Sequence, residues 1–133
     1  MFRKKKKLVS DDDKIKELVK QYRETGQQVA YISGAYRSET LYGVVGNIRH
    51  AEKYAIEFWK RGYAVICPHK NTALLDGTCD DSVWLRGDLE LLARSDVIVM
   101  IPGWENSEGA KIELEFAKQQ GKSVIYATDS DVT

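Results

Sequence analysis

The sequence predicts an α/β domain of three layers: a flavodoxin-like or Rossmann-like parallel sheet of four core strands in the order 2-1-3-4, with flanking helices. Two observations lead to this fold class. Four short apolar runs alternate with segments whose apolar residues recur at helical spacing, which is the pattern of βα units with right-handed crossovers. The run from Val97 to Ile101 contains no polar residue, as expected for a strand that is buried on both faces.

The first part of the chain predicts one helix and one strand. Three aspartates favour a helix start, apolar residues then recur at helical spacing, and Gly26 ends the periodic segment. The run Val29–Ser33 follows as the first strand. We expect the helix to pack against the domain through its apolar row of Ile15, Leu18, Val19 and Tyr22.

The middle of the chain predicts a second βα unit and a long loop. A helix is expected over Asn47–Arg61, and a strand over Tyr63–Cys67 is closed by Pro68. The loop Asn71–Asp81 contains the turn dipeptide Asp76-Gly77 and is long enough to form a flap over a site.

The last part predicts two more βα units. Ser107 or Asn106 is placed to cap the helix that ends at Gly121. In chain order we expect a helix over Ser82–Arg94, a strand over Asp96–Ile101, a loop over Pro102–Glu108, the capped helix and a strand over Ser123–Ala127.

Composition favours an ordinary globular protein. Hydrophobic residues make up 43% of the 133 residues, and 20 basic residues balance 20 acidic ones, so charge gives no general attraction to nucleic acid or membrane. No apolar run approaches the roughly 20 residues that span a bilayer. The basic N-terminus is not followed by an apolar segment, so we expect no signal peptide and a cytoplasmic location. The spacing of Cys67, His69 and Cys79 matches no zinc pattern, and we expect neither metal nor other cofactor.

We expect residues 1–10 to form a disordered basic tail and residues 11–133 to form a single domain. The run Lys4–Lys7 is typical of a solvated tail. An anionic partner such as RNA is the alternative interpretation, which the lack of aromatic residues among the lysines disfavours.

Two carboxylates occur on the apolar faces of predicted helices. Glu113 has Gly109, Ala110 and Ala117 at three or four residues' distance, whereas Glu115 is flanked by lysines, as on a solvated face. In the preceding helix Asp88 lies among Trp84, Leu85 and Leu92. A carboxylate on a packed face is costly unless it has partners or a function. Two in one small domain indicate a paired acid site.

The predicted strand order places these acids beside two polar loops. The first and third strands are neighbours whose chains leave in opposite directions, and ligands of such folds bind in the crevice that opens there. The loops Ser33–Ser38 and Pro102–Glu108 should line this crevice. Gly34 lets the backbone turn closely, while Ser33, Tyr36 and Arg37 supply hydroxyls and a cation suited to sugar or phosphate. His69 follows the second strand and is a candidate for the pocket wall.

On these residues the chain resembles the nucleoside 2-deoxyribosyltransferase-like superfamily, which includes nucleoside deoxyribosyltransferases and deoxynucleoside 5′-monophosphate N-glycosidases. It looks closest to their small bacterial and phage relatives. The resemblance covers residues 29–127. Its most specific part is the spacing of Ser107, Gly109, Glu113 and Ala117, and its other parts are Tyr31–Arg37, Asn47-Ile48, Cys67–His69, Gly87-Asp88 and Ser95-Asp96.

The resemblance implies a role for each matching residue. Glu113 corresponds to the nucleophile that attacks the anomeric carbon, and Asp88 to the group that assists at the nucleobase. Ser107 corresponds to the position that is Ser in monophosphate hydrolases and Asp in transferases, so a nucleotide is favoured as substrate. The resemblance also implies that Tyr31, Gly34, Tyr36 and Arg37 hold sugar or phosphate.

Two further functions stay open at this point. The same crevice could bind or sense a nucleotide without cleaving it, and a protein-interaction scaffold would need no small molecule at all. If the protein is an enzyme, we expect Glu113 to stay ionised and Asp88, with a pKa raised by burial, to donate the proton. Relatives complete their sites across subunits, so we expect a homo-oligomer, a dimer or larger, with Trp59, Trp84 and Trp104 as large apolar contact residues.

Overall fold

A computed structural model, which describes residues 9–133, confirms the predicted α/β fold. Its sheet has four parallel strands in the order β2-β1-β3-β4, namely β1 (Val29–Ser33), β2 (Ala64–Ile66), β3 (Val97–Met100) and β4 (Ser123–Tyr126). The inner pair is in register from Ala30 opposite Val97 to Ser33 opposite Met100. The helices are α1 (Asp11–Thr25), α2 (Leu41–Lys60), α3 (Pro68–Asn71), α4 (Asp81–Ala93) and α5 (Glu108–Gln119), with 3-10 turns η1 (Trp104–Asn106) and η2 (Asp129–Val132).

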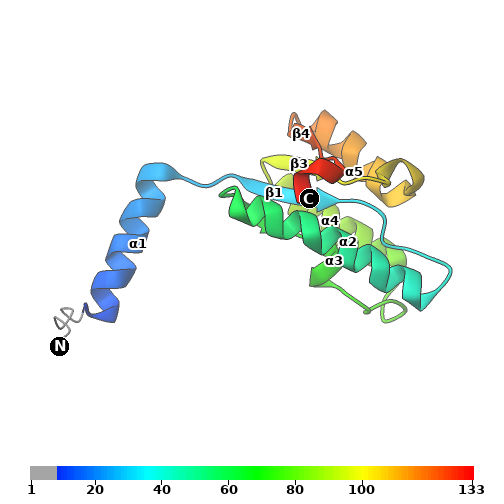
Figure 1. Ribbon diagram of the computed structural model, residues 1–133, viewed down its shortest axis with the longest axis horizontal. Coiled ribbons are helices and arrows are strands. Elements are labelled where there is room, and N and C mark those ends of the chain that lie inside the picture. The colour runs from blue at the N-terminus through cyan, green and yellow to red at the C-terminus, as the bar shows by residue number, and fades with distance from the viewer. Residues whose placement is uncertain (1–8) are drawn as a thin grey trace.

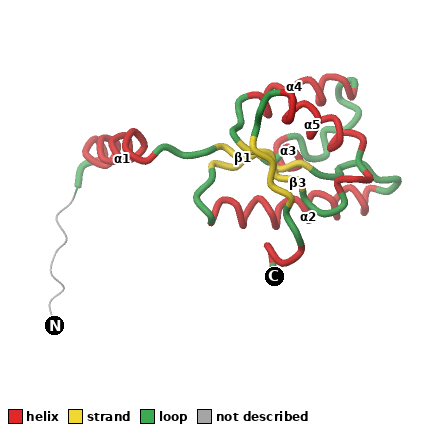
Figure 2. Tube along the Cα trace, turned by 90° about the horizontal axis from the view of Figure 1, so that it is seen from above, coloured by secondary structure: helices red, strands yellow, loops and turns green. Residues whose placement is uncertain are grey.

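Side chains that alternate along the inner strands build two cores. Ala30, Ile32 and Val99 face α2, which buries Ala51, Tyr54, Ala55 and Phe58 against them. Tyr31, Ile98 and Met100 face the other way, onto Leu92 of α4 and Ala110, Leu114 and Ala117 of α5. The chain therefore forms three layers, with α2 on one side of the sheet and α4 and α5 on the other (Figure 2).

The expectation that the first helix packs against the domain is wrong. Helix α1 forms over its predicted range, with Ser10 as its cap, but none of its residues is buried. It projects away from the sheet (Figure 1). The predicted tail run Lys4–Lys7 lies outside the described residues.

The start of α2 and the presence of α3 are the larger differences from the predictions. Helix α2 begins at Leu41, six residues before the predicted Asn47, because the hydroxyl of Thr40 accepts a hydrogen bond from the Gly43 amide (3.0 Å) and Val44 is buried. The short helix α3 was not predicted. Pro68 opens it at a position where a missing amide hydrogen costs nothing, and it brings His69 back under the end of β1.

Among residues 9–133 no helix has the length and apolarity that crossing a membrane requires.

Candidate active site

A cavity of about 620 Å³ opens beyond the carboxyl end of β1, between α4, α5 and the loops that the sequence analysis singled out. Its volume lies in the range of small-molecule sites. Eight of the ten predicted site residues line it: Gly34, Tyr36, Arg37, His69, Asp88, Ser107, Gly109 and Glu113.

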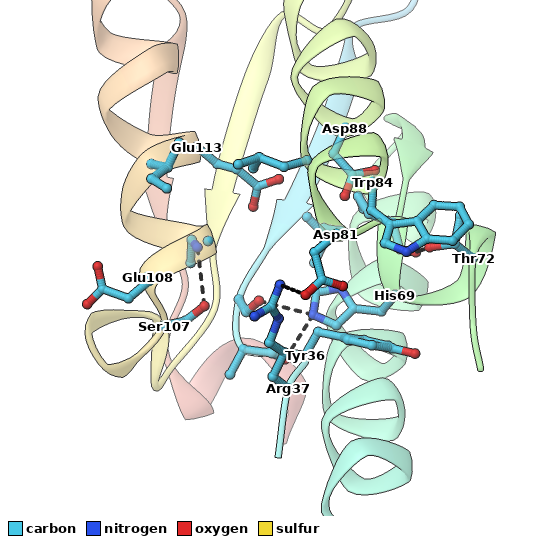
Figure 3. Close-up of a pocket in the computed structure, with 18 of the residues that line it drawn as sticks. Tyr36, Arg37, His69, Thr72, Asp81, Trp84, Asp88, Ser107, Glu108 and Glu113 are labelled. Atoms are coloured by element: carbon cyan, nitrogen blue, oxygen red, sulfur yellow. Dashed lines mark hydrogen bonds and ion pairs between the residues drawn. The ribbon is translucent and has the colours of Figure 1, made fainter. Parts of the chain in front are cut away.

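The two acids face this one cavity from different helices. Glu113 points out of α5 and Asp88 out of α4, toward one another across the space between the helices (Figure 3). Glu113 retains only 8% of its exposure, whereas Asp88 is half-buried. The structure therefore brings the two acids that the sequence analysis singled out to one cavity.

Glu113 is held by two hydroxyl groups of β1. The Tyr31 hydroxyl donates to one carboxylate oxygen and the Ser33 hydroxyl to the other, at 2.8 Å for Ser33. We expected Tyr31 and Ser33 to contact substrate, but both are fully buried and neither lines the cavity. Because residues 31 and 33 share one face of the strand, they position Glu113 from behind.

Burial raises the pKa of both acids. The pKa of Glu113 rises to about 7, because desolvation and the charge of Asp88 outweigh the hydrogen bonds from Tyr31 and Ser33. The pKa of Asp88 rises to about 6 through desolvation. Glu113 lies deeper and has the larger rise, so burial by itself does not favour the expected arrangement, with Glu113 ionised and Asp88 protonated. Burial also raises the pKa of Tyr31, so its phenol stays a hydrogen-bond donor.

His69 is fixed as one tautomer. Its Nε2 lies 3.2 Å from the Gly34 carbonyl and 3.0 Å from the Ala35 carbonyl, so it must carry the proton and donate. Burial lowers its pKa, which keeps the ring neutral. Nδ1 is left as a buried acceptor with no hydrogen-bond partner among the described residues. The imidazole therefore ties the first loop to α3.

Gly34 is required by the packing of the protein itself. A Cβ at this position would lie 2.3 Å from Cγ1 of Ile101, so no other residue fits unless the buried Ile101 side chain moves. Gly109 differs, because a Cβ there would meet only the Ser107 hydroxyl, at 3.9 Å. The space above Gly109 at the start of α5 thus belongs to the cavity.

Ser107 caps α5, its hydroxyl accepting a hydrogen bond from the Ala110 amide at 3.2 Å. The first amides of a helix lack partners within the helix and attract anions. Ser107 and Gly109 therefore bring the start of α5 to the cavity wall.

Two acids that the sequence analysis missed hold the mouth of the cavity. Arg37 pairs with Asp81 at 2.8 Å, both side chains being exposed, and the Tyr36 hydroxyl donates to Asp76 at 2.6 Å while accepting from the Leu74 amide. The predicted flap is thus anchored to the first loop. Asp76 looked like an ordinary turn residue, and nothing local in the sequence identifies such long-range pairs.

The cavity also has an apolar wall next to Asp88, made by Trp84 and Leu85. The sequence pattern placed both on the buried side of their helix. Both are only half-buried in the structure. Their place on the apolar face of the helix was predicted, but their exposure to the cavity was not.

No metal site is apparent in this part of the chain. Among residues 9–133 no group of three or more His, Cys, Asp and Glu side chains is placed to hold a metal ion. Cys67 and Cys79 are both free thiols.

The sequence of the chain matches a described protein family. Residues 28–126 match the family described as a domain of unknown function (DUF4406). The chain belongs to the DUF4406 family. The match spans β1 to β4, so it contains the whole cavity and excludes α1. No curated protein matches the sequence.

A solved structure shares the fold of this DUF4406 domain. It is a 2-deoxyribosyltransferase from the psychrotolerant bacterium Bacillus psychrosaccharolyticus, with a TM-score of 0.57 and 20% sequence identity. The alignment covers 72% of this chain and 69% of that one. At this identity the similarity establishes a distant relationship in fold.

Proposed function

We propose that this DUF4406 domain cleaves or transfers the N-glycosidic bond of a nucleoside, deoxynucleoside or nucleoside 5′-monophosphate. One observation carries the proposal: Glu113 and Asp88 enter a single cavity from two helices, and Glu113 accepts hydrogen bonds from two hydroxyl groups of β1. The shared fold with a 2-deoxyribosyltransferase supports nucleoside chemistry at this site.

In the proposed first step a Glu113 carboxylate oxygen attacks C1′ of the sugar. The C1′–N bond breaks and its electron pair leaves with the base, which takes a proton from the Asp88 carboxyl. The sugar is then an ester of Glu113. In the second step water, or the nitrogen of another base, attacks C1′ and expels Glu113, and Asp88 takes up the released proton.

This chemistry needs the proton on Asp88 and not on Glu113. Burial raises the pKa of both carboxyl groups into the same range, about 7 for Glu113 and about 6 for Asp88, so burial alone does not place the single proton on Asp88. Positive charge develops on the sugar in the transition state, which favours the ionised Glu113. The hydroxyls of Tyr31 and Ser33 act in the same direction, because they stabilise its charged form.

The rest of the cavity suits a nucleotide. The start of α5, with Ser107 and the open space at Gly109, is a site for a 5′-phosphate or a 5′-hydroxyl. The half-exposed face of Trp84, beside Asp88, suits a nucleobase. In this arrangement C1′ lies between the two carboxyl groups.

The second candidate is a module that binds or senses a nucleotide without cleaving it. It is favoured by the engagement of Arg37 with Asp81 and of Tyr36 with Asp76, since two predicted binding groups already have partners. A ligand that displaced Asp81 from Arg37 would couple binding to movement of the flap, as a sensor requires.

The test is incubation with a panel of deoxynucleosides, ribonucleosides and their 5′-monophosphates, followed by chromatography of the free base. Release of base that falls at least 1000-fold in Glu113→Gln supports the enzyme. The matched control is Glu115→Gln, the same chemical change at an exposed position of the same helix, which should leave the rate unchanged. Stabilisation by a ligand without base release supports the sensor.

A further inference from the structure

Helix α2 carries a second row of apolar residues that no part of the described structure covers. Its buried face packs on the sheet, whereas Tyr42 is 89%, Val45 37%, Ile56 50% and Trp59 55% exposed. Arg49 and Glu52 continue this row between its two apolar ends and form an ion pair of 3.1 Å. The spacing alternates between three and four residues along the row, which is the seam spacing of paired helices.

The row is nearly symmetric about its own centre. Read from either end, it runs through an aromatic residue, an aliphatic residue and a charged residue, with the centre between His50 and Ala51. When a second α2 is laid antiparallel with that centre superposed, Tyr42 meets Trp59 of the other copy and Val45 meets Ile56. Arg49 then meets Glu52, so the two central contacts join opposite charges.

We propose that two copies of this chain associate through α2 about a twofold axis that passes beside His50 and Ala51. A twofold contact uses the same patch on both subunits, and the order of apolar and charged residues in this row meets that requirement. The row is about 25 Å long, because it spans 17 helical steps of roughly 1.5 Å. Neither His50 nor Ala51 lines the cavity, so the proposal goes beyond the proposed function and does not depend on it.

The row on α1 is the other exposed apolar row of the described chain. Ile15, Leu18, Val19 and Tyr22 are all uncovered, and α1 projects away from the sheet (Figure 1). This row is also spaced symmetrically, but it has no charged pair at its centre, so no pairing of opposite charges selects one antiparallel register as it does on α2. A contact between α1 of one copy and α2 of another is therefore an outcome that the test must separate.

The test uses full-length chains and sedimentation velocity between about 1 and 300 μM, where small interfaces dissociate. Wild type should pass from monomer to dimer in this range. Arg49→Glu alone places two acids opposite each other at both central contacts, and Glu52→Arg alone places two cations there. We expect each variant to dimerise at least tenfold more weakly than wild type.

Mixing the two variants gives the decisive result. In a mixed dimer Glu at position 49 of one chain meets Arg at position 52 of the other, and both central contacts again join opposite charges. The mixture should therefore dimerise within threefold of wild type. Lys118→Glu and Glu115→Arg, the same charge changes at exposed positions of α5, are the matched controls and should behave as wild type, alone and mixed.

Several results would overturn the proposal. Wild type that stays monomeric up to 300 μM would do so. So would a mixture no more dimeric than its components, once circular dichroism shows both to be folded. If Glu52→Arg does not fold after losing the Lys70 contact, Ile56→Asp serves in its place, and an undiminished dimer refutes the α2 interface. If Leu18→Asp abolishes the dimer and Ile56→Asp does not, the interface lies on α1 and not on α2.

Discussion

Replacing Glu113 by Gln should make the protein more stable at alkaline pH while it removes the proposed activity. The carboxyl group is buried, and its pKa rises from 4.5 to about 7 on folding. A carboxyl with a raised pKa binds its proton more tightly in the folded state than in the unfolded state. Its ionisation therefore destabilises the fold, and the neutral amide of Gln cannot ionise.

The size of the effect follows from the two pKa values. Below pH 4.5 the group is protonated in both states and stability does not depend on it. Between pH 4.5 and about 7 the unfolded chain loses the proton first, and the free energy of unfolding falls by about 1.4 kcal/mol for each pH unit. Above about pH 7 the whole penalty of about 3 kcal/mol remains.

The assay is urea unfolding of wild type and variant at about pH 5 and about pH 8.5, on either side of this window. The difference in free energy of unfolding between the two proteins should change by about 3 kcal/mol in favour of Gln, or roughly 10 °C in melting temperature. Comparing two pH values cancels any constant effect of the new amide on packing or on the Tyr31 and Ser33 hydroxyls. Glu115→Gln, exposed on the same helix, should show no such change.

A difference that is the same at both pH values would refute the reasoning, because Glu113 would then ionise without cost in the folded protein. A difference that grows in the opposite direction would show that Tyr31 and Ser33 more than compensate for burial.

Three further predictions concern the site. The rate of base release should follow a bell-shaped pH profile centred near pH 6.5, between the pKa values of about 6 and 7. Asp88→Asn should remove the alkaline limb of this profile. The midpoint of the acid limb that remains should lie below pH 7, since the charge of Asp88 raises the pKa of Glu113. Tyr31→Phe should raise the pKa of Glu113 and so move the centre of the bell to higher pH, with a rate loss of about 10- to 100-fold, and an unchanged centre would contradict the positioning role. Gly34→Ala should cost about 1–3 kcal/mol in urea unfolding, because its Cβ would overlap the Ile101 side chain. A cost below about 0.5 kcal/mol would show that this side chain moves aside freely.

The layout of the fold was available from the sequence because its determinants are local. Each inner strand is a largely apolar run, and a helix between successive strands indicates that the strands are parallel. The start of α2 was harder to predict from the sequence. Gly43 and Gly46 lower helix propensity, so the first turns of α2 depend on the Thr40 cap and on the burial of Val44. Both are tertiary or capping effects that periodicity does not report.

The candidate site divides in the same way. Glu113 and Asp88 were visible because a charged residue interrupts an apolar helical face, and such an interruption can be seen in a single sequence. The role of Tyr31 depends on which face of β1 turns toward α5, and strand alternation fixes this only once the facing helix is known. Asp81 could not be found at all, because its contact with Arg37 joins residues far apart in the chain.

The cost of Glu113 bears on whether the site catalyses or only binds. A penalty of about 3 kcal/mol is a large part of the 5–15 kcal/mol that stabilises a typical domain. A glutamine at this position could still bond to Tyr31 and Ser33, so a protein that only held a nucleotide would gain stability from the exchange and lose no contact that needs a charge. An anionic carboxylate confers an advantage where positive charge develops, and in a nucleoside that place is C1′ during departure of the base. If base release is absent and Glu113→Gln binds nucleotides as well as wild type, this advantage disappears and the charge has no function at the site.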